Sequence, residues 1–238
     1  MLSSLLVRVN ANCGFEPFVV PREVLNKVPG NFARFHLAPL GVGRGRFSNP
    51  MVRSSLIAVF TAESLATNYA LIGFANVKLM DAIVFITAFL FGWTVGVGIA
   101  VSTWTVYGFL NPYGQAGFPL ILFLIAGECF YAIGGSLLQR SSTAKQLLSE
   151  RRLISDLEIV IIFGVVGVVL TFAYDVLTNF ATYMFLASSF YEALLIGIIT
   201  GAPFALVHEG SNFFFFAFAG PAGIIAGRRI ILSRGSPR

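Results

Sequence analysis

The feature that most constrains this chain is the absence of any charged side chain between Asp81 and Glu128. This interval is long enough for at least two membrane-spanning helices, since about 20 apolar residues cross the hydrocarbon core of a bilayer. The composition agrees, with 56% hydrophobic and 11% charged residues and a mean hydropathy of +0.81. A soluble globule of this length needs more polar surface. The sequence therefore predicts an all-α integral membrane protein in contact with the lipid bilayer.

Glycine, proline and polar clusters divide the apolar part of the chain into six predicted transmembrane helices. Their expected ranges are 55–75, 79–91, 94–110, 116–138, 156–186 and 190–227. The breaks lie at 74–78, at Gly92-Trp93, at 111–114, between Arg140 and Asp156, and at 187–189. The second helix is short for a membrane span, which suggests that it is tilted or partly buried.

The distribution of basic residues predicts the orientation of these helices. Most of them lie in the first fifty positions, between Arg140 and Arg152, or after Arg228, whereas the loops at the opposite ends contain only Lys78. Because positively charged loops stay in the cytoplasm, we expect a multi-pass protein of the cell membrane with both termini inside. The connections 74–81, 111–116 and 187–190 are then outside. The net charge of +5 fits this topology and need not imply nucleic acid.

Residues 1–50 differ in kind from the predicted six-helix membrane domain at 51–238. They are basic, contain Pro and Gly, and end in the sequence GVGRGRFSNP. They are interpreted as a disordered basic arm or as the result of a start codon placed upstream of Met51. A signal peptide is disfavoured, because Arg8 and Asn10 interrupt the short apolar run. Cys13 and Cys129 have no motif spacing, so neither a disulfide framework nor a zinc site is predicted.

Ionisable side chains fall within or beside the predicted helices at Glu63, Asp81, Glu128, Asp175, Glu192, His208 and Glu209. We expect Asp81 and Glu192 near the outer interface and the others deeper. A carboxylate at mid-bilayer costs roughly 2.5–3.5 kcal/mol unless it is paired or lines a wet cavity.

The deeper polar residues are arranged by helix face. Asp175 and Asn179 are four residues apart, and His208 and Asn212 repeat this spacing in the sixth helix, so each pair shares a face. Further hydroxyl and carboxyl groups lie nearby in the sequence at Tyr174, Tyr183, Glu128 and Tyr131. Two interpretations stay open: a solvent-accessible pocket, or hydrogen bonds that only hold helices together. In either case we expect Asp175 to meet a donor from His208, an asparagine amide, water or a ligand.

A row of small residues marks the first predicted helix. Ala58, Ala62, Ala66 and Ala70 recur at every fourth position. Small side chains in such a row let another helix approach closely. The row is consistent with a face for a partner protein, with internal packing, or with chance in an alanine-rich helix.

Four segments carry a resemblance to a known family: NVKLMDAIVFITAFLFG at 76–92, NPYG at 111–114, YDVLTNFAT at 174–182 and GAPFALVHEGSNFFF at 201–215. Their order and spacing resemble the substrate-binding S component of energy-coupling factor (ECF) transporters, over about residues 51–228. The resemblance implies a six-helix bundle with an outward-opening pocket that the loop between the first two helices covers.

The resemblance also implies site residues and partners. Ala58, Ala62 and Ala66 would meet a transmembrane coupling subunit. Residues at or near the pocket would be Asn76, Asn111, Asp175, Asn179, His208 and Asn212; Glu128 and Tyr174 join them as candidates from their place on the predicted polar faces. No phosphate-loop sequence occurs, so energy would come from a separate pair of ATPases. The expected role is uptake of a vitamin-like small molecule, with no cofactor and no chemistry on the substrate.

Two other classes of function remain open. Phe204, His208 and Asn212 have a spacing similar to that of CPBP-type (CAAX-type) membrane proteases, but that family also needs an adjacent glutamate pair, which this chain lacks. The zinc-binding motif HExxH of metalloproteases is not present either, because position 212 is Asn and not His. The predicted membrane domain therefore has too few ligands for a catalytic zinc ion. A structural assembly subunit is the third interpretation.

The sequence restricts the chemical class of the ligand only through the residue types of the predicted pocket. Carboxylates, amides, one imidazole and several rings suit a flat or amphiphilic metabolite with hydrogen-bond donors or a positive charge. A bare metal ion is disfavoured, because the predicted membrane domain contains one histidine and no clustered sulfur ligands.

Overall fold

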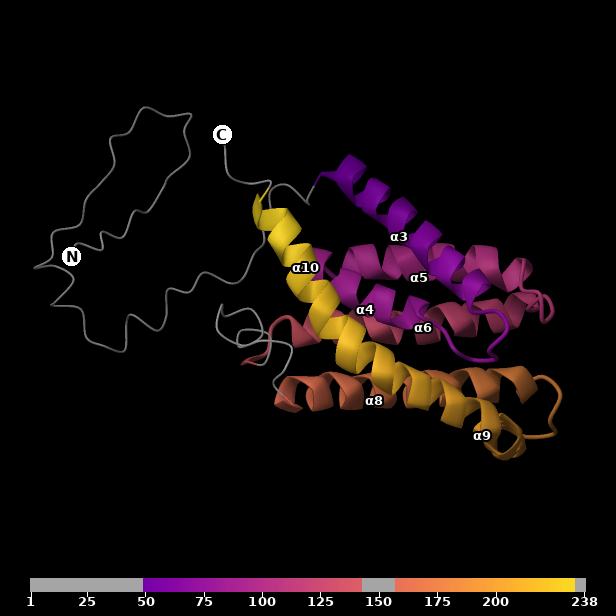
Figure 1. The fold of residues 1–238 in the computed structure, drawn as a ribbon. Helices are drawn as coiled ribbons and strands as arrows, with labels where there is room; N and C mark the ends of the chain where they lie inside the picture. The colour runs from indigo at the N-terminus through magenta and orange to yellow at the C-terminus, as the bar shows by residue number, and fades with distance from the viewer. Residues whose placement is uncertain (1–48, 143–156, 234–238) are drawn as a thin grey trace, which may run out of the picture. The chain divides into compact units, whose positions relative to one another are not determined.

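The computed structural model describes residues 49–142 and 157–233, and all regular structure in these ranges is helical (Figure 1). The elements are α3 (Pro50–Ala70), α4 (Met80–Phe91), α5 (Trp93–Phe109), α6 (Phe118–Leu138), α8 (Leu157–Tyr183), α9 (Phe190–Phe214), the π-helical stretch η1 (Phe215–Ala219) and α10 (Gly220–Ser233). The predicted N-terminal arm up to residue 48 and the basic residues of the 143–156 connection lie outside the described residues.

Three helical segments are long and apolar enough to cross a membrane: Phe118–Leu138, Leu157–Tyr183 and Phe190–Ile231. Large apolar side chains are exposed along them, among them Val169 on α8 and Ile199 and Leu206 on α9. Such an exterior is compatible with lipid and unusual for a protein in water. The all-helical class predicted from the sequence is thus confirmed for the described residues, and their long apolar helices are compatible with the predicted membrane protein.

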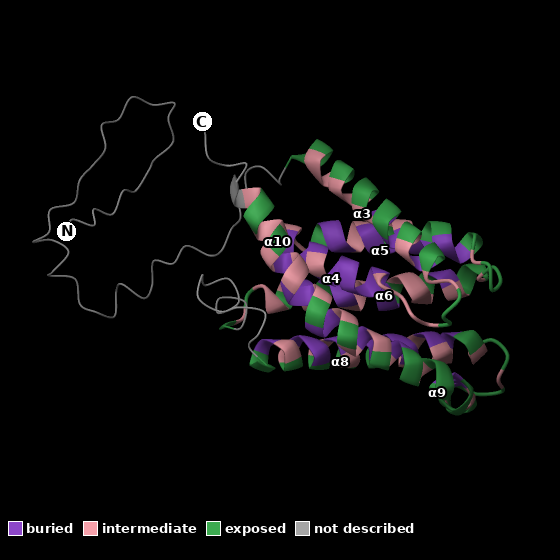
Figure 2. Cartoon of the chain, in the orientation of Figure 1, coloured by how far each residue is buried: buried purple, intermediate pink, exposed green. Residues whose placement is uncertain are grey.

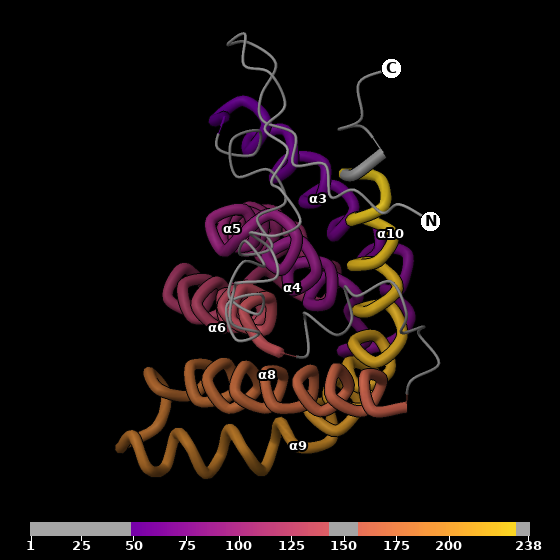
Figure 3. The backbone as a smooth tube through the Cα atoms, turned by 90° about the vertical axis from the view of Figure 1, so that its left-hand side faces the viewer, coloured from indigo at the N-terminus to yellow at the C-terminus, as the bar shows by residue number. Residues whose placement is uncertain are grey.

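The short helix α4 lies at the centre of the fold. It packs against α3, α5, α6 and α10, and ten of its twelve residues are buried (Figure 2). At 1.5 Å per residue it is about 18 Å long, well short of the ~30 Å hydrocarbon core. The expectation that the second helix is partly buried is therefore confirmed. On the other side of α6 lies α8, and the antiparallel helix α9 packs against α8 (Figure 3).

The first helix begins and ends at other residues than the sequence predicted, because local capping decides both ends. The first helix begins at Pro50 and not at 55, because Asn49 caps it by accepting a hydrogen bond from the Met51 backbone amide at 2.9 Å, and proline suits the first helical position. It ends at Ala70 and not at 75, and residues 71–79 form a loop in which Asn76 adopts a left-handed conformation with φ of 58°.

The breaks predicted at Gly92, at 111–114 and at 187–189 fall on non-helical residues, although α8 ends at Tyr183 and not at 186. Most of the break between Arg140 and Asp156 lies outside the described residues. Gly92, with φ of 97°, separates α4 from α5 without any loop. At the start of α9, the Ser189 side chain accepts from the Glu192 amide, and the Glu192 carboxylate accepts from the Ser188 amide. The predicted single helix 190–227 is corrected in one respect: five π-helical residues interrupt it at Phe215–Ala219, and helix continues to Ser233.

The contact between α4 and α6 supplies a test of this packing. A Cβ atom at Gly135 would overlap the backbone carbonyl oxygen of Phe85, whereas a Cβ at Gly210 would have nothing within 4 Å. Because backbone cannot move aside as a side chain can, we expect Gly135→Ala to lower the free energy of unfolding by about 3 kcal/mol. Gly210→Ala should leave it unchanged or raise it slightly. Equal effects of the two substitutions, measured by unfolding in detergent, would contradict this helix contact.

Candidate functional site

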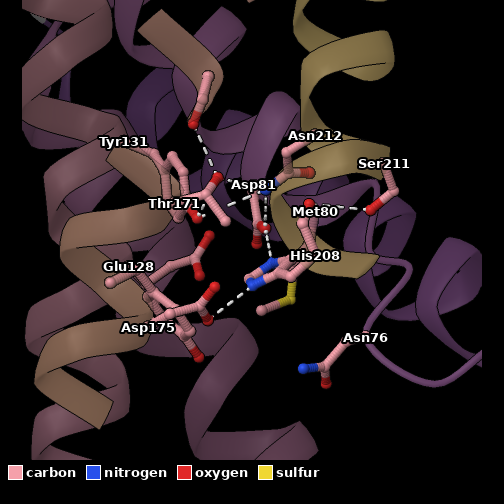
Figure 4. A network of polar contacts seen from close by, with 12 residues as sticks. Asn76, Met80, Asp81, Glu128, Tyr131, Thr171, Asp175, His208, Ser211 and Asn212 are labelled. Carbon is pink, nitrogen blue, oxygen red and sulfur yellow. Dashed lines mark hydrogen bonds and ion pairs between the residues drawn. The ribbon is translucent and has the colours of Figure 1, made fainter. Parts of the chain in front are cut away.

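His208 lies between two carboxylates at the middle of the fold (Figure 4). Its Nδ1 atom is 2.9 Å from Asp175 Oδ1 on α8, and its Nε2 atom is 2.7 Å from Asp81 Oδ2 on α4. His208 is fully buried, and so is Asp81. Each ring nitrogen of an imidazole can donate to a carboxylate, and the charged form donates from both, so His208 can bridge Asp81 and Asp175. The predicted donor for Asp175 is confirmed, and it is His208.

Asn212 extends these contacts to one more helix, α6. Its amide nitrogen lies 2.7 Å from Asp81 Oδ2, 2.8 Å from Thr171 Oγ1 and 3.5 Å from the Tyr131 hydroxyl. Tyr131 in turn donates to Thr171 over 3.1 Å. Four helices therefore meet through hydrogen bonds between side chains. We call the following residues the polar cluster: Asp81, Glu128, Tyr131, Thr171, Asp175, His208 and Asn212.

Glu128 enters the polar cluster from α6 and links it to aromatic side chains. Its Oε2 atom accepts a hydrogen bond of 3.1 Å from the indole nitrogen of Trp104, and the carboxyl group also interacts electrostatically with Asp81. The Trp104 ring stacks on Tyr174 with 6.4 Å between ring centroids. Lys78 Nζ lies over both rings, 5.2 Å from the Trp104 centroid and 5.6 Å from that of Tyr174.

A cavity of about 480 Å³ lies on the other side of this aromatic pair. Its lining includes Lys78 and Trp104 together with the amide side chains of Asn68, Asn76 and Asn111. Apolar and aromatic residues complete it: Leu71, Ile72, Phe74, Ala75, Val77, Tyr107, Tyr113 and Phe204. The volume and the mixture of rings with a few polar groups are those of a small-molecule site.

The 71–79 loop covers this cavity and is fastened at several points. The Tyr113 hydroxyl donates to the Ile72 carbonyl, and the Asn76 amide donates to the Phe204 carbonyl of α9 over 3.3 Å. The last turn of α3 is held as well, because the Tyr69 hydroxyl donates to the Leu110 carbonyl over 3.1 Å. These bonds join the loop to α9 and to the α5–α6 connection. The cavity is thus lined by chain segments far apart in the sequence, and it is open on one side.

The predicted binding residues fall into three groups in the structure. Asn76 and Asn111 line the cavity. The larger group lies beneath it in or beside the polar cluster and does not line it: Glu128, Tyr174, Asp175, His208 and Asn212. Asn179 faces α9, as does Asp175 one turn earlier, and its side chain packs against Gly201. A ligand-binding role for these residues stays a prediction.

Sequence reasoning missed three residues that the structure places at this site. Asp81 was expected near the outer interface, yet it is the carboxylate that both His208 and Asn212 contact. Lys78 was interpreted only as a topology signal, and Trp104 was not singled out. The available signal was the closeness of Lys78 and Asp81, a cation and an anion three residues apart where a short, otherwise apolar helix begins.

The alanine row of α3 is exposed. Ala58, Ala62, Ala66 and Ala70 all lie on the outer face of the helix, while Thr61, Ser64 and Asn68 face inward. Packing against the described residues therefore does not explain the row. A partner protein remains one explanation, and chance in an apolar helix is the other.

Within the described ranges, no group of three or more His, Cys, Asp or Glu side chains is arranged to hold a metal ion. Both nitrogens of His208 are taken up by the Asp81 and Asp175 carboxylates. The chain matches no protein-family model, and comparison with curated proteins and with solved structures finds no significant match. The resemblance to ECF S components therefore rests on the sequence motifs alone.

Proposed function

We propose that this chain is the substrate-capturing membrane subunit of an ECF-type importer for a vitamin-like small molecule. The observation that carries the proposal is the cavity of about 480 Å³ beneath the 71–79 loop, which has the size and lining of a small-molecule site. In this proposal all six helical segments lie in the cell membrane with both termini in the cytoplasm. The cavity then faces outward, because the 71–79 and 110–117 connections are on the outer side.

Capture would depend on the loop and release on a partner. The bonds from Tyr113 and Asn76 that fasten the loop are few and lie at the protein surface. Bonds of this kind open more readily than the buried polar cluster, so a ligand could enter beneath the loop. The polar cluster holds α4, α6, α8 and α9 together while the loop moves. Energy for inward release would come from a coupling subunit and an ATPase pair, as the resemblance implies.

The exposed alanine row supplies the experiment that tests this proposal. Ala62 lies on the outer face of α3, so Ala62→Trp should leave folding and ligand binding intact. If the row is the site where a coupling subunit packs, the added indole should abolish energised uptake by cells that contain the partner subunits. Ala62→Ser, which keeps a small side chain at the same exposed position, is the matched control and should leave uptake unchanged. Unchanged uptake with Ala62→Trp would contradict the partner contact.

A further inference from the structure

The charge of the cavity lining differs from that of the polar cluster beneath it. Three carboxylates, those of Asp81, Glu128 and Asp175, belong to the cluster, and none of them lines the cavity. Among the described residues, Lys78 is the only charged side chain in the cavity lining. A ligand in the cavity therefore meets a cation first and reaches the carboxylates only through Lys78 and the rings of Trp104 and Tyr174.

The ammonium group of Lys78 is poised to accept an anion. It lies over the faces of Trp104 and Tyr174, and in the described part of the chain no carboxylate comes within ion-pair distance of it. Ring faces leave ammonium hydrogens without a strong acceptor, so a carboxylate in the cavity would gain charge-assisted hydrogen bonds. The carboxyl groups of Asp81 and Glu128 in the polar cluster interact electrostatically with this ammonium group.

The other lining groups indicate the shape of the ligand. Trp104 and Tyr107 pack edge to face with 5.7 Å between centroids, and both line the cavity. Flat aromatic walls favour a flat ring system. Asn68 and Asn111 add amide groups that can donate to or accept from ring substituents.

From these observations we infer that the cavity binds a planar molecule carrying an anionic group, with the anion on Lys78 and the ring against Trp104. This inference rests on the proposed function and narrows its substrate class. It differs from the class that the sequence favoured, a ligand with donors or a positive charge, because the carboxylates that motivated that expectation lie outside the cavity lining.

Three probes with the same ring system test the charge preference: 2-naphthoate, 2-naphthamide and 2-naphthylmethylammonium. The chain has two tryptophans, Trp93 and Trp104, so a Trp93→Phe background makes Trp104 the only indole that emits. Quenching of its fluorescence is then titrated on the full chain in detergent. We expect the anion to bind at least tenfold more tightly than the cation. Lys78→Met should remove this preference, and Lys78→Arg should keep it.

The outcomes separate this inference from the proposed function. Tighter binding of the cation, or an anion preference that survives Lys78→Met, overturns the inference and leaves capture of a small molecule standing. If none of the three probes quenches Trp104, the cavity itself is in question and the proposed function fails with it. Should Lys78→Met not fold, the ranking of the three probes on the Trp93→Phe protein decides alone.

Discussion

Replacing His208 with leucine is expected to lower the free energy of unfolding by about 3–5 kcal/mol. The substitution removes the group that bonds to Asp81 at 2.7 Å and to Asp175 at 2.9 Å, and leaves two buried carboxylates without their shared donor. The loss of a buried partner costs more than the loss of the bond itself, because the remaining charges cannot return to water. Unfolding of the full chain in mixed detergent micelles measures the effect.

Two further variants show whether charge is the cause. The triple substitution Asp81→Asn, Asp175→Asn and His208→Leu removes the carboxylates together with the imidazole, so it should recover part of the stability lost in His208→Leu. Glu63→Gln, on the exposed face of α3, should change stability by no more than about 0.5 kcal/mol. A triple variant less stable than His208→Leu would show that shape, and not charge, governs the polar cluster.

The asparagine substitution of Asp175 alone should be milder. His208 keeps its contact with Asp81, and an amide oxygen can still accept a hydrogen bond at position 175. We expect a loss of about 1–2 kcal/mol, the scale of a single buried hydrogen bond. Comparing Asp175→Asn with His208→Leu separates the stability contributed by the His208–Asp175 contact from that contributed by the His208–Asp81 contact. An effect as large as that of His208→Leu would place the main cost on the α8 side.

Much of the helical layout could be predicted from residue patterns, because breaks depend on local chemistry. Gly92 ends α4 where the sequence predicts a break, and its positive φ explains why glycine stands there. The start of α3 was missed because the Asn49-Pro50 cap lies just before the predicted apolar run. The π-helical stretch at 215–219 has no local signal, since it depends on how side chains such as Phe216 pack against α8.

Part of the polar cluster was also predictable. The four-residue spacing of Asp175 and Asn179 placed both on one helix face, and both do face α9. The cost of an unpaired buried carboxylate predicted that Asp175 has a hydrogen-bond partner, and His208 was one of the four candidates. Helical periodicity thus determines which residues share a face, and the energetics of burial determine that a partner exists.

The depth of Asp81 could not be predicted in the same way. In the sequence Asp81 opens a short helix next to Lys78, which suggests an interface. In the structure α4 is surrounded by its neighbours, so even its first turn is buried. Burial at a helix end depends on the lengths and tilts of the adjacent helices, which residue spacing does not record. The role of Lys78 in the cavity lining was hidden for the same reason.

The central claim of this account is that the cavity beneath the 71–79 loop holds a small molecule. Native mass spectrometry of the full chain, purified in a mild detergent from cells that express it, tests this most directly. We predict that the unmodified protein and Ala62→Trp each retain one small molecule per chain. Val77 lines the cavity, so Val77→Trp should fill the space and abolish retention while the helical content by circular dichroism stays the same. A bare protein mass in every sample, or equal retention by Val77→Trp, would contradict the claim.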